Sequence, residues 1–294
     1  MSDLKPHPMA PKSTPLSQTL IAEAVAAALR EDWEDAGDIT STAVIPAEAH
    51  AHAVIRAREA GILAGLDLAK AAFGAHASGL KVTCHKTDGD RLAPGDDVAE
   101  IEGPARALLA AERVALNYLG HLSGIASRTA HVAALVAHTK ARICDTRKTT
   151  PGLRLLEKYA VQTGGGANHR FGLHDAVLIK DNHIAVAGSI TAALTAAQAA
   201  SGDTLPIEIE VDTLAQMEEA LSAGAKIILL DNMTPTQLAQ AVALNQGRAV
   251  LEASGRVSEE TVVAIAESGV DFISLGALTH STRSLDLGLD IDIS

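Results

Sequence analysis

Aromatic residues and cysteines are scarce in this sequence. Phe, Tyr and Trp together account for 2% of the 294 residues, and the two cysteines are Cys84 and Cys144. Two cysteines cannot form a disulfide framework, and their spacing matches no metal-binding motif. The apolar residues, 47% of the chain, are mainly Ala, Leu, Val and Ile. This composition suits close packing of helices on a parallel sheet.

A basic excess is also absent. The chain has 24 Lys and Arg against 36 Asp and Glu, which gives a formal net charge of −12 at pH 7. Nonspecific nucleic-acid binding needs cations that displace phosphate counterions, so this charge argues against it. The sequence has no long apolar span, and residues 1–15 are polar and Pro-rich, unlike a signal peptide. We therefore expect a soluble, cytoplasmic protein that binds neither nucleic acid nor a membrane.

The first part of the chain predicts a small mixed α/β sandwich domain over residues 17–115. It follows residues 1–16, which we expect to form a flexible tail. Ser17 is a suitable N-cap for a helix over residues 18–30. Later stretches of alternating polarity, separated by Gly and Pro, predict an antiparallel sheet: residues 51–57, 61–63, 80–86 and 97–101. Residues 105–136 have helical periodicity and predict one or two helices that bridge the domains, with Gly120 and Gly124 permitting close backbone approach.

The second half alternates between strands and helices. Six short aliphatic runs lead into residues able to do chemistry, and helices lie between most of them. Expected helix starts are Thr150-Pro151, Ser189, Thr213, Thr234-Pro235 and Ser258. Six units are fewer than the usual eight, so we predict an incomplete, about six-stranded β/α barrel over residues 116–284. A doubly wound sheet is the alternative. Residues 285–294 form a C-terminal tail that can pack back on the first domain.

The charged residues after these runs are expected to form one site. In a β/α barrel the C-terminal strand ends converge on one face, where active sites are built. Between residues 145 and 183 the chain has six Lys and Arg against four acids. A solvated helix face accounts for Arg154 and Lys158, but four cations lie in loops or at strand ends: Arg147, Lys148, Arg170 and Lys180. Two arginines with lysines in one pocket suit a polyanion, because guanidinium groups bind carboxylate and phosphate in a bidentate manner.

Two carboxylates are expected beside these cations. Glu210 and Asp231 end successive strands and should be neighbours. Two carboxylates at a phosphate-binding pocket are a usual way to hold Mg²⁺, which keeps several waters and shares phosphate oxygens. The alternative is that they form ion pairs with Lys180 or Lys148. By strand alternation Glu208 lies on the same face as Glu210, which makes the assignment of Glu210 less specific.

Small residues follow the last two runs, where phosphate-binding loops often occur in barrels. Ser254-Gly255 follows one run, and Gly276-Ala277 follows the other. Backbone N–H groups in such loops, together with a helix N-terminus, can surround a phosphate. We therefore expect Ser254, Gly255 and Gly276 to bind a phosphate group.

At these positions the chain resembles the quinolinate phosphoribosyltransferases, also called nicotinate-nucleotide pyrophosphorylases (decarboxylating). The resemblance runs from residue 31 to residue 279 and leaves out only the two ends. The matching motifs are Glu112-Arg113-Val-Ala-Leu-Asn117, Asp145-Thr-Arg-Lys-Thr-Thr-Pro-Gly152, Gly164-Gly-Gly-Ala-Asn-His-Arg170, Ile179-Lys-Asp-Asn-His183, Glu208-Ile-Glu-Val-Asp212, Leu229-Leu-Asp-Asn-Met233 and Leu251-Glu-Ala-Ser-Gly255.

The resemblance implies a reaction of NAD biosynthesis. Quinolinate and phosphoribosyl pyrophosphate would give nicotinate mononucleotide, pyrophosphate and carbon dioxide, with Mg²⁺ required. It also implies an N-terminal α/β sandwich, a C-terminal incomplete β/α barrel, and dimers or multiples of dimers. In these dimers the N-terminal domain of one subunit closes the barrel of its partner.

The resemblance also implies residue roles. Arg147, His169, Arg170 and Lys180 would hold the quinolinate carboxylates, and Arg113 would reach that pocket from the partner subunit. The phosphoribosyl pyrophosphate and its Mg²⁺ would be bound by Lys148, Glu210, Asp231, Ser254, Gly255 and Gly276. Among these residues Lys148, Lys180, Glu210 and Asp231 would serve catalysis. Arg256 departs from the family pattern, in which a small or amide residue commonly follows Ser-Gly.

Three other functions remain alternatives. Lys180 at a barrel strand end could form a Schiff base, as in aldolase-type lyases. A paralogue that keeps the phosphoribosyl machinery could take another acceptor, such as one associated with molybdate transport. A binding or structural role without catalysis is the third alternative, but it would not explain so many charges at strand ends.

Overall fold

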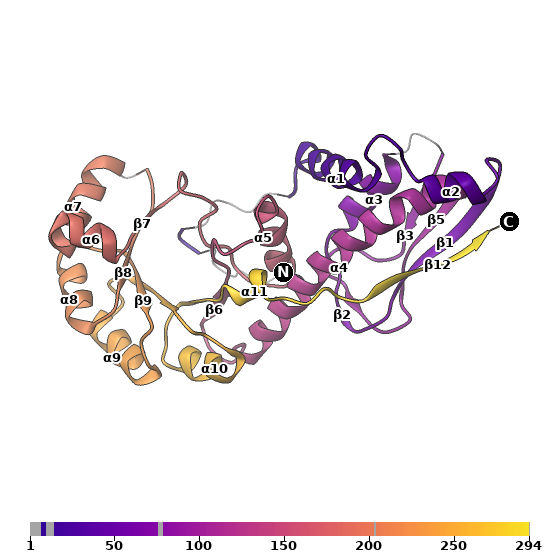
Figure 1. Ribbon diagram of the computed structural model, residues 1–294. Coiled ribbons are helices and arrows are strands. Elements are labelled where there is room, and N and C mark those ends of the chain that lie inside the picture. The colour runs from indigo at the N-terminus through magenta and orange to yellow at the C-terminus, as the bar shows by residue number, and fades with distance from the viewer. Residues whose placement is uncertain (1–6, 10–14, 76–78, 203, 294) are drawn as a thin grey trace. The chain divides into compact units, whose positions relative to one another are not determined.

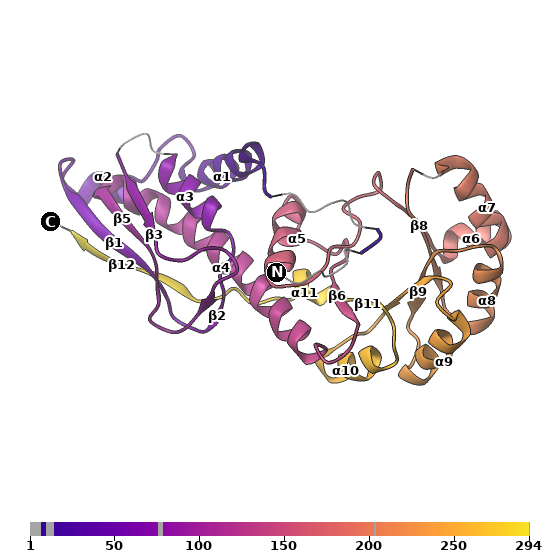
Figure 2. The ribbon, with the colours of Figure 1, turned by 180° about the vertical axis from the view of Figure 1, so that it is seen from behind.

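The computed structural model describes residues 7–9, 15–75, 79–202 and 204–293, which Figures 1 and 2 draw as a coloured ribbon. Contacts divide the chain into two compact units. Of the described residues, unit 1 contains 7–9, 129–154 and 165–281, and unit 2 contains 15–128, 155–164 and 282–293. The division falls inside the helix α4 (Ala105–Leu135), whereas we expected a boundary at residue 115.

Unit 2 is built on an antiparallel sheet. In spatial order its strands are β12 (Leu287–Ile293), β1 (His50–Ala57), β5 (Asp97–Pro104) and β3 (Lys81–Cys84). β2 (Gly61–Ile62) and β4 (Arg91–Leu92) form a separate pair. Burial alternates along β1, as expected for a strand with one covered face. The C-terminal strand β12 pairs with β1 from Ala51↔Ile293 to Ala57↔Leu287, and Figure 2 shows it along this edge of the sheet.

Helices complete unit 2. They are α1 (Gln18–Trp33), α2 (Ile39–Val44), α3 (Leu66–Gly74), the first part of α4, and most of α5 (Arg154–Thr163). The Ser17 hydroxyl accepts the N–H of Leu20 at 3.1 Å, so the predicted cap of α1 is confirmed. On α5 the prediction of a solvated face is wrong for Lys158, which is fully buried beside Glu157. The Glu157 carboxylate is paired with Nε2 of His121 at 2.9 Å.

α4 is a single helix of 31 residues rather than two. Its two glycines allow the C-terminal segment of the chain to lie directly against the helix backbone. A Cβ at Gly124 would come within 2.2 Å of the Arg283 carbonyl oxygen, and one at Gly120 within 3.1 Å of the Leu285 carbonyl oxygen. The Leu285 N–H also donates to the Gly120 carbonyl at 2.9 Å. The expected close approach at both glycines is therefore confirmed.

Unit 1 contains the predicted six strands. In spatial order they are β6 (Arg142–Cys144), β11 (Phe272–Ser274), β10 (Val250–Ser254), β9 (Ile227–Asp231), β8 (Ile207–Val211) and β7 (Val177–Ile179). All neighbouring pairs are parallel. The order does not reverse in the middle of the sheet, which distinguishes it from a doubly wound sheet. Within the described residues β6 and β7 do not pair, so the barrel is incomplete, as predicted.

Helices follow the strands on the convex side of this sheet (Figure 1). They are α6 (Asp181–Ala187), α7 (Ile190–Ser201), α8 (Leu214–Ser222), α9 (Pro235–Asn245) and α10 (Glu259–Glu267), with the short α11 (Ala277–His280) after β11. Four expected N-caps are confirmed: Ser189, Thr213, Thr234 and Ser258. The start at Pro151 is wrong, because Gly152 has a φ of 81° and the helix begins only at Arg154.

No single helix in the described part of the chain is both long and apolar enough to span a membrane. One bent pair, Asp181–Ala187 with Ile190–Ser201, passes the criterion of length and composition only when both helices are counted together. The angle between these two helices is 94°.

A short N-terminal segment, residues 7–9, packs inside unit 1. His7 and Met9 are each 1% exposed. Met9 contacts Ala176 and Ile227, at the N-terminal ends of β7 and β9. We expected a flexible tail up to residue 16. His7 and Met9 are instead buried at the base of the barrel, and Pro8 between them is exposed. Residues 1–6 and 10–14 lie outside the described residues. Burial of the apolar Met9 side chain stabilises this segment in the barrel, which a prediction from its polar, Pro-rich composition did not include.

Candidate active site

A pocket of 710 Å³ lies at the C-terminal strand ends of unit 1. Every expected site residue lines it except Arg113. These residues are Arg147, Lys148, His169, Arg170, Lys180, Glu210, Asp231, Ser254, Gly255 and Gly276. Their convergence follows from the parallel strands, whose C-terminal ends meet at one face. Sequence reasoning did not assign other lining residues to the pocket, among them Glu252, Ser274 and His280.

Arg113 lies on α4 in unit 2. Its side chain is 65% exposed, and its guanidinium lies 3.9 Å from the Glu112 carboxylate. The role implied by the family, contact with the pocket of a partner subunit, stays a prediction.

Two arginines supply cations with unsatisfied donors. Nε of Arg147 and Nε of Arg170 are buried and have no hydrogen-bond partner within the described residues. Arg170 is 6% exposed, and its Nη1 donates to the Ala176 carbonyl at 3.0 Å. Burial, followed by the nearby Arg147 guanidinium, lowers the pKa of Arg170. Buried donors without partners are costly, so these side chains are suited to an anionic ligand.

The loop that carries His169 and Arg170 is fixed to the end of β6. Ala167 forms a parallel bridge with Cys144, and its N–H donates to the Ile143 carbonyl at 2.8 Å. The fully buried Asp145 carboxylate accepts the His169 N–H at 2.8 Å and the Asn168 side-chain amide at 2.5 Å. Asp145 thus positions the loop that places His169 and Arg170 in the pocket. In the sequence, Asp145 is recognisable only as an acidic residue at a strand end, and that position does not reveal its contacts with the His169 loop.

Two carboxylates face the pocket beside Lys180. The Lys180 ammonium forms an ion pair with Glu210. Asp231 ends the neighbouring strand β9 and accepts a hydrogen bond from the Asn232 amide at 2.5 Å. Burial, followed by the charge of Asp212, raises the pKa of Asp231. The ion pair that we gave as the alternative to Mg²⁺ binding therefore exists at Glu210, and a divalent cation would offset the unfavourable charge at Asp231.

Two glycines on the expected phosphate loops are required by close packing. A Cβ at Gly255, where φ is 87°, would lie 2.3 Å from Oδ1 of Asn232. A Cβ at Gly276 would lie 2.9 Å from Cδ of Lys148. The neighbouring Arg256 has a φ of 50°, which is unusual for a residue with a side chain. Gly255, Arg256 and Gly276 all line the pocket.

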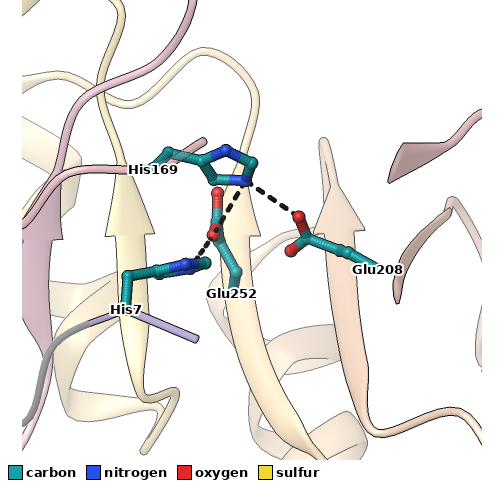
Figure 3. A group of neighbouring side chains, drawn as sticks. All are labelled: His7, His169, Glu208 and Glu252. Carbon is teal, nitrogen blue, oxygen red and sulfur yellow. Dashed lines mark hydrogen bonds and ion pairs between the residues drawn. The ribbon is translucent and has the colours of Figure 1, made fainter. Parts of the chain in front are cut away.

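A buried cluster of two histidines and two glutamates lies at the floor of the pocket; we call it the floor cluster (Figure 3). The Glu252 carboxylate lies between the imidazoles of His7 and His169, at 2.5 Å and 3.7 Å. Nε2 of His169 lies 2.8 Å from the Glu208 carboxylate. Burial raises the pKa of both carboxyls, but at Glu252 the electrostatic interactions with His169 and His7 and the hydrogen bond from His7 outweigh burial and lower its pKa to about 2. At Glu208 burial and the charge of Glu252 prevail, and its pKa is raised.

Comparisons with known proteins give the same family over most of the chain. Residues 38–123 match the family model of the quinolinate phosphoribosyl transferase N-terminal domain, and residues 125–290 match that of its C-terminal domain. The probable nicotinate-nucleotide pyrophosphorylase (carboxylating) of Bacillus subtilis is 46% identical over 258 residues, which cover 88% of this chain and 89% of that protein. The Mycobacterium leprae nicotinate-nucleotide pyrophosphorylase (carboxylating) is 46% identical over 271 residues, 90% of this chain and 94% of that protein.

Solved structures agree with this result. NadC from Streptococcus pyogenes superposes with a TM-score of 0.90 and 44% identity, and covers 96% of this chain and 99% of its own. The nicotinate-nucleotide pyrophosphorylase from Francisella tularensis gives a TM-score of 0.90 and 37% identity, with 95% and 98% covered. The chain therefore belongs to the quinolinate phosphoribosyltransferase family.

Proposed function

We propose that this protein transfers the phosphoribosyl group of phosphoribosyl pyrophosphate to quinolinate, with decarboxylation. The products are nicotinate mononucleotide, pyrophosphate and carbon dioxide, and the step belongs to de novo NAD biosynthesis. The observation that carries this proposal is the pair of arginines Arg147 and Arg170, whose buried Nε donors have no partner within the described residues. They lie in one pocket with Lys148 and Lys180, where they can neutralise two substrates that would otherwise repel each other.

The quinolinate subsite is assigned to the base of this pocket. Arg147 and Arg170 bind its carboxylates through guanidinium N–H groups, and Lys180 adds a third cation. His169 borders the same subsite, but both of its ring nitrogens have partners in the protein: Nδ1 accepts the Arg170 N–H and Nε2 pairs with Glu208. His169 therefore contacts the substrate through its ring face or after exchange of one of these bonds.

The phosphoribosyl pyrophosphate subsite is assigned to the loops and carboxylates around it. Lys148 contacts the pyrophosphate, and Ser254, Gly255 and Gly276 bind a phosphate through the backbone. The residues present fit Mg²⁺: Glu210 and Asp231 offer carboxylate oxygens from neighbouring strands, and the raised pKa of Asp231 indicates that a cation would be favourable there. When bound, Mg²⁺ supplies positive charge to the pyrophosphate oxygens.

The chemistry requires positioning and charge rather than a protein nucleophile. The pyridine nitrogen attacks C1 of the ribose as the bond from C1 to the pyrophosphate oxygen breaks, so positive charge develops on the ring of the sugar. Once the ring nitrogen is alkylated, the adjacent carboxylate departs as carbon dioxide, and the positive charge of the pyridinium stabilises the electron pair left on the ring carbon. A proton from water then binds to the ring carbon that has lost the carboxylate. Lys148 stabilises the leaving pyrophosphate, and Glu210 and Asp231 stabilise the developing cation.

We further propose a cytoplasmic homodimer, or a multiple of it, in which Arg113 reaches the partner's pocket. The family motif around Arg113 and its high exposure in the single chain support this assignment. Sedimentation should show a dimer, and mixing an Arg113→Ala chain with a chain inactive through Lys148→Ala should restore part of the activity. If each pocket were formed by one chain alone, mixing the two variants would restore no activity.

The experiment that tests the reaction uses purified protein with quinolinate, phosphoribosyl pyrophosphate and Mg²⁺. Carbon dioxide and nicotinate mononucleotide should form in equal amounts and vanish when any one component is omitted. Arg147→Ala and Arg170→Ala should each lower kcat/KM for quinolinate by about 10- to 100-fold, because a hydrogen bond to a charged group contributes ~1.5–3 kcal/mol. Arg248→Ala is the control, since Arg248 is exposed and precedes β10 at the strand end opposite the pocket.

Three outcomes would reject this assignment. Unchanged kinetics in both pocket variants would remove the arginines from the quinolinate subsite. Turnover of phosphoribosyl pyrophosphate with another acceptor, but not with quinolinate, would identify the altered-acceptor paralogue. Covalent trapping at Lys180 by borohydride with a carbonyl substrate would instead indicate a Schiff-base lyase.

A further inference from the structure

We propose that His7 is a positioning residue of this active site: residues 7–9 close the base of the barrel, and His7 binds the Glu252 carboxylate that adjoins His169 at the pocket floor. The effect on quinolinate binding rests on the proposed function. The placement of His7 does not. Residues 7–9 lie outside the ranges matched to the family, 38–123 and 125–290.

The first step is the packing of residues 7–9. Met9 contacts Ala176 and Ile227 at the N-terminal strand ends. The His7 ring lies edge-on to Phe272, with centroids 4.3 Å apart, and 4.9 Å from the His169 ring. The segment thus fills the inner face of the sheet below the pocket. Both side chains are 1% exposed, so they are part of the interior of unit 1.

The second step is the protonation of the two rings. Nδ1 of His7 accepts the Met9 N–H at 3.1 Å, and Nδ1 of His169 accepts the Arg170 N–H at 2.8 Å. A nitrogen that accepts a hydrogen bond carries no proton, so each neutral imidazole has its proton on Nε2. Nε2–H of His7 then donates to Glu252 and Nε2–H of His169 donates to Glu208. The floor cluster is a pair of imidazole–carboxylate hydrogen bonds.

A bound metal ion is the other explanation for two histidines and two glutamates in one place, and the geometry argues against it. A metal ion would bind through the lone pair of Nε2. Because Nδ1 of each ring accepts a backbone N–H, the ring proton lies on Nε2, and no lone pair is available at Nε2 for a metal ion. The paired atoms are also too close, at 2.5 Å and 2.8 Å. Ligands of a tetrahedral zinc ion, with bonds of ~2.0–2.1 Å, are about 3.3 Å apart.

The third step links the floor cluster to the substrate. Glu252 and His169 both line the pocket in which a dicarboxylate is proposed to bind. An ionised Glu252 without a donor would repel that ligand, and it would compete with Glu208 for the His169 N–H from 3.7 Å away. The hydrogen bond from His7 satisfies Glu252 from below and leaves His169 directed at Glu208. Loss of His7 should therefore weaken quinolinate binding more than phosphoribosyl pyrophosphate binding.

The test compares His7→Ala, His7→Gln and Met9→Ala with Pro8→Ala, an exposed position in the same segment that serves as the control. His7→Ala should raise KM for quinolinate about tenfold, the effect of one hydrogen bond to a charged group. KM for phosphoribosyl pyrophosphate and kcat should stay within about twofold. His7→Gln keeps a donor and should restore part of the affinity, whereas Pro8→Ala should match the parent. Equal kinetics in His7→Ala and the parent, or equal changes in both KM values, would overturn the proposal.

A measurement without substrate separates this inference from the proposed function. Nitrogen-15 NMR of the full-length protein labelled at histidine should show two rings with the Nε2–H tautomer. In His7→Ala one of these signals should vanish and the His169 signal should shift. Two rings of the other tautomer would refute the assigned hydrogen bonds. Stoichiometric binding of added Zn²⁺ that is lost in His7→Ala would show a metal site instead, and would also refute the assignment. If the parent fails to use quinolinate, the NMR result still decides the placement of His7.

Discussion

Replacing Asp145 should both destabilise the barrel and displace the loop that carries His169 and Arg170. Asp145 is fully buried at the end of β6, and its carboxylate accepts the His169 N–H and the Asn168 side-chain amide. The Asp145→Ala variant leaves both donors without this partner, in a place that water does not reach. Leaving one buried donor unsatisfied costs ~1–3 kcal/mol. We therefore expect the free energy of unfolding to fall by about 2–6 kcal/mol from these two bonds.

A second variant at the same position makes the reasoning specific. Asp145→Asn keeps one oxygen for the His169 N–H and loses the acceptor for Asn168, so its loss should be about half that of Asp145→Ala, ~1–3 kcal/mol. The assay is urea unfolding followed by far-UV circular dichroism, with quinolinate KM measured on the same samples. Asp35→Ala, at an exposed position, is the control. A loss below about 0.5 kcal/mol in Asp145→Ala, or an equal loss in both variants, would refute the role of the two hydrogen bonds.

Three further results are expected. Gly124→Ala should lower the melting temperature strongly, because its Cβ would meet the Arg283 carbonyl oxygen at 2.2 Å, whereas Gly74→Ala, with open space around it, should have little effect. Glu208 has a raised pKa, so its contribution to stability is complete below the unfolded value of about 4.3 and is lost as the pH rises through the folded value. Glu208→Gln should flatten this decline in urea unfolding between pH 5 and pH 8, and an unchanged slope would contradict it. Removal of Mg²⁺ with EDTA should abolish turnover, and Asp231→Asn should raise the Mg²⁺ concentration needed for half-maximal rate by about tenfold; full activity in EDTA would contradict both.

Local signals predicted much of the fold. Ser189, Thr213 and Thr234 were expected to start helices, and each hydroxyl accepts a backbone N–H of its own first turn. Capping depends on a few neighbouring residues, which makes it readable from sequence. Pro151 failed as a helix start for an equally local reason, because Gly152 takes a left-handed conformation that interrupts the helix. Gly152 directly after Pro151 is itself a sequence signal against a helix that begins at Pro151.

Contacts between distant residues could not be predicted in the same way. Lys158 has the spacing of an ordinary helix-surface cation, yet it is fully buried. His7 is 245 residues from its hydrogen-bond partner Glu252, and no pattern near either residue indicates the pairing. Polar and proline-rich composition around His7 suggested a loose tail. Composition reports what a segment can do alone, whereas the burial of His7 depends on a gap that only the assembled barrel presents.

Strand alternation predicted on which face of the sheet each carboxylate lies, but not how deeply it is buried. The burial of each carboxylate determines its function. Glu208 and Glu210 lie on one face of β8. Glu210 pairs with Lys180 at the strand end, while Glu208 is fully buried and bonded to His169. Two acids in the floor could have neutralised the nearby arginines and removed them from substrate binding. The histidines prevent this by occupying Glu208 and Glu252, so the Nε donors of Arg147 and Arg170 are left for an anionic ligand. An acidic chain can in this way present a cationic pocket to two anionic substrates.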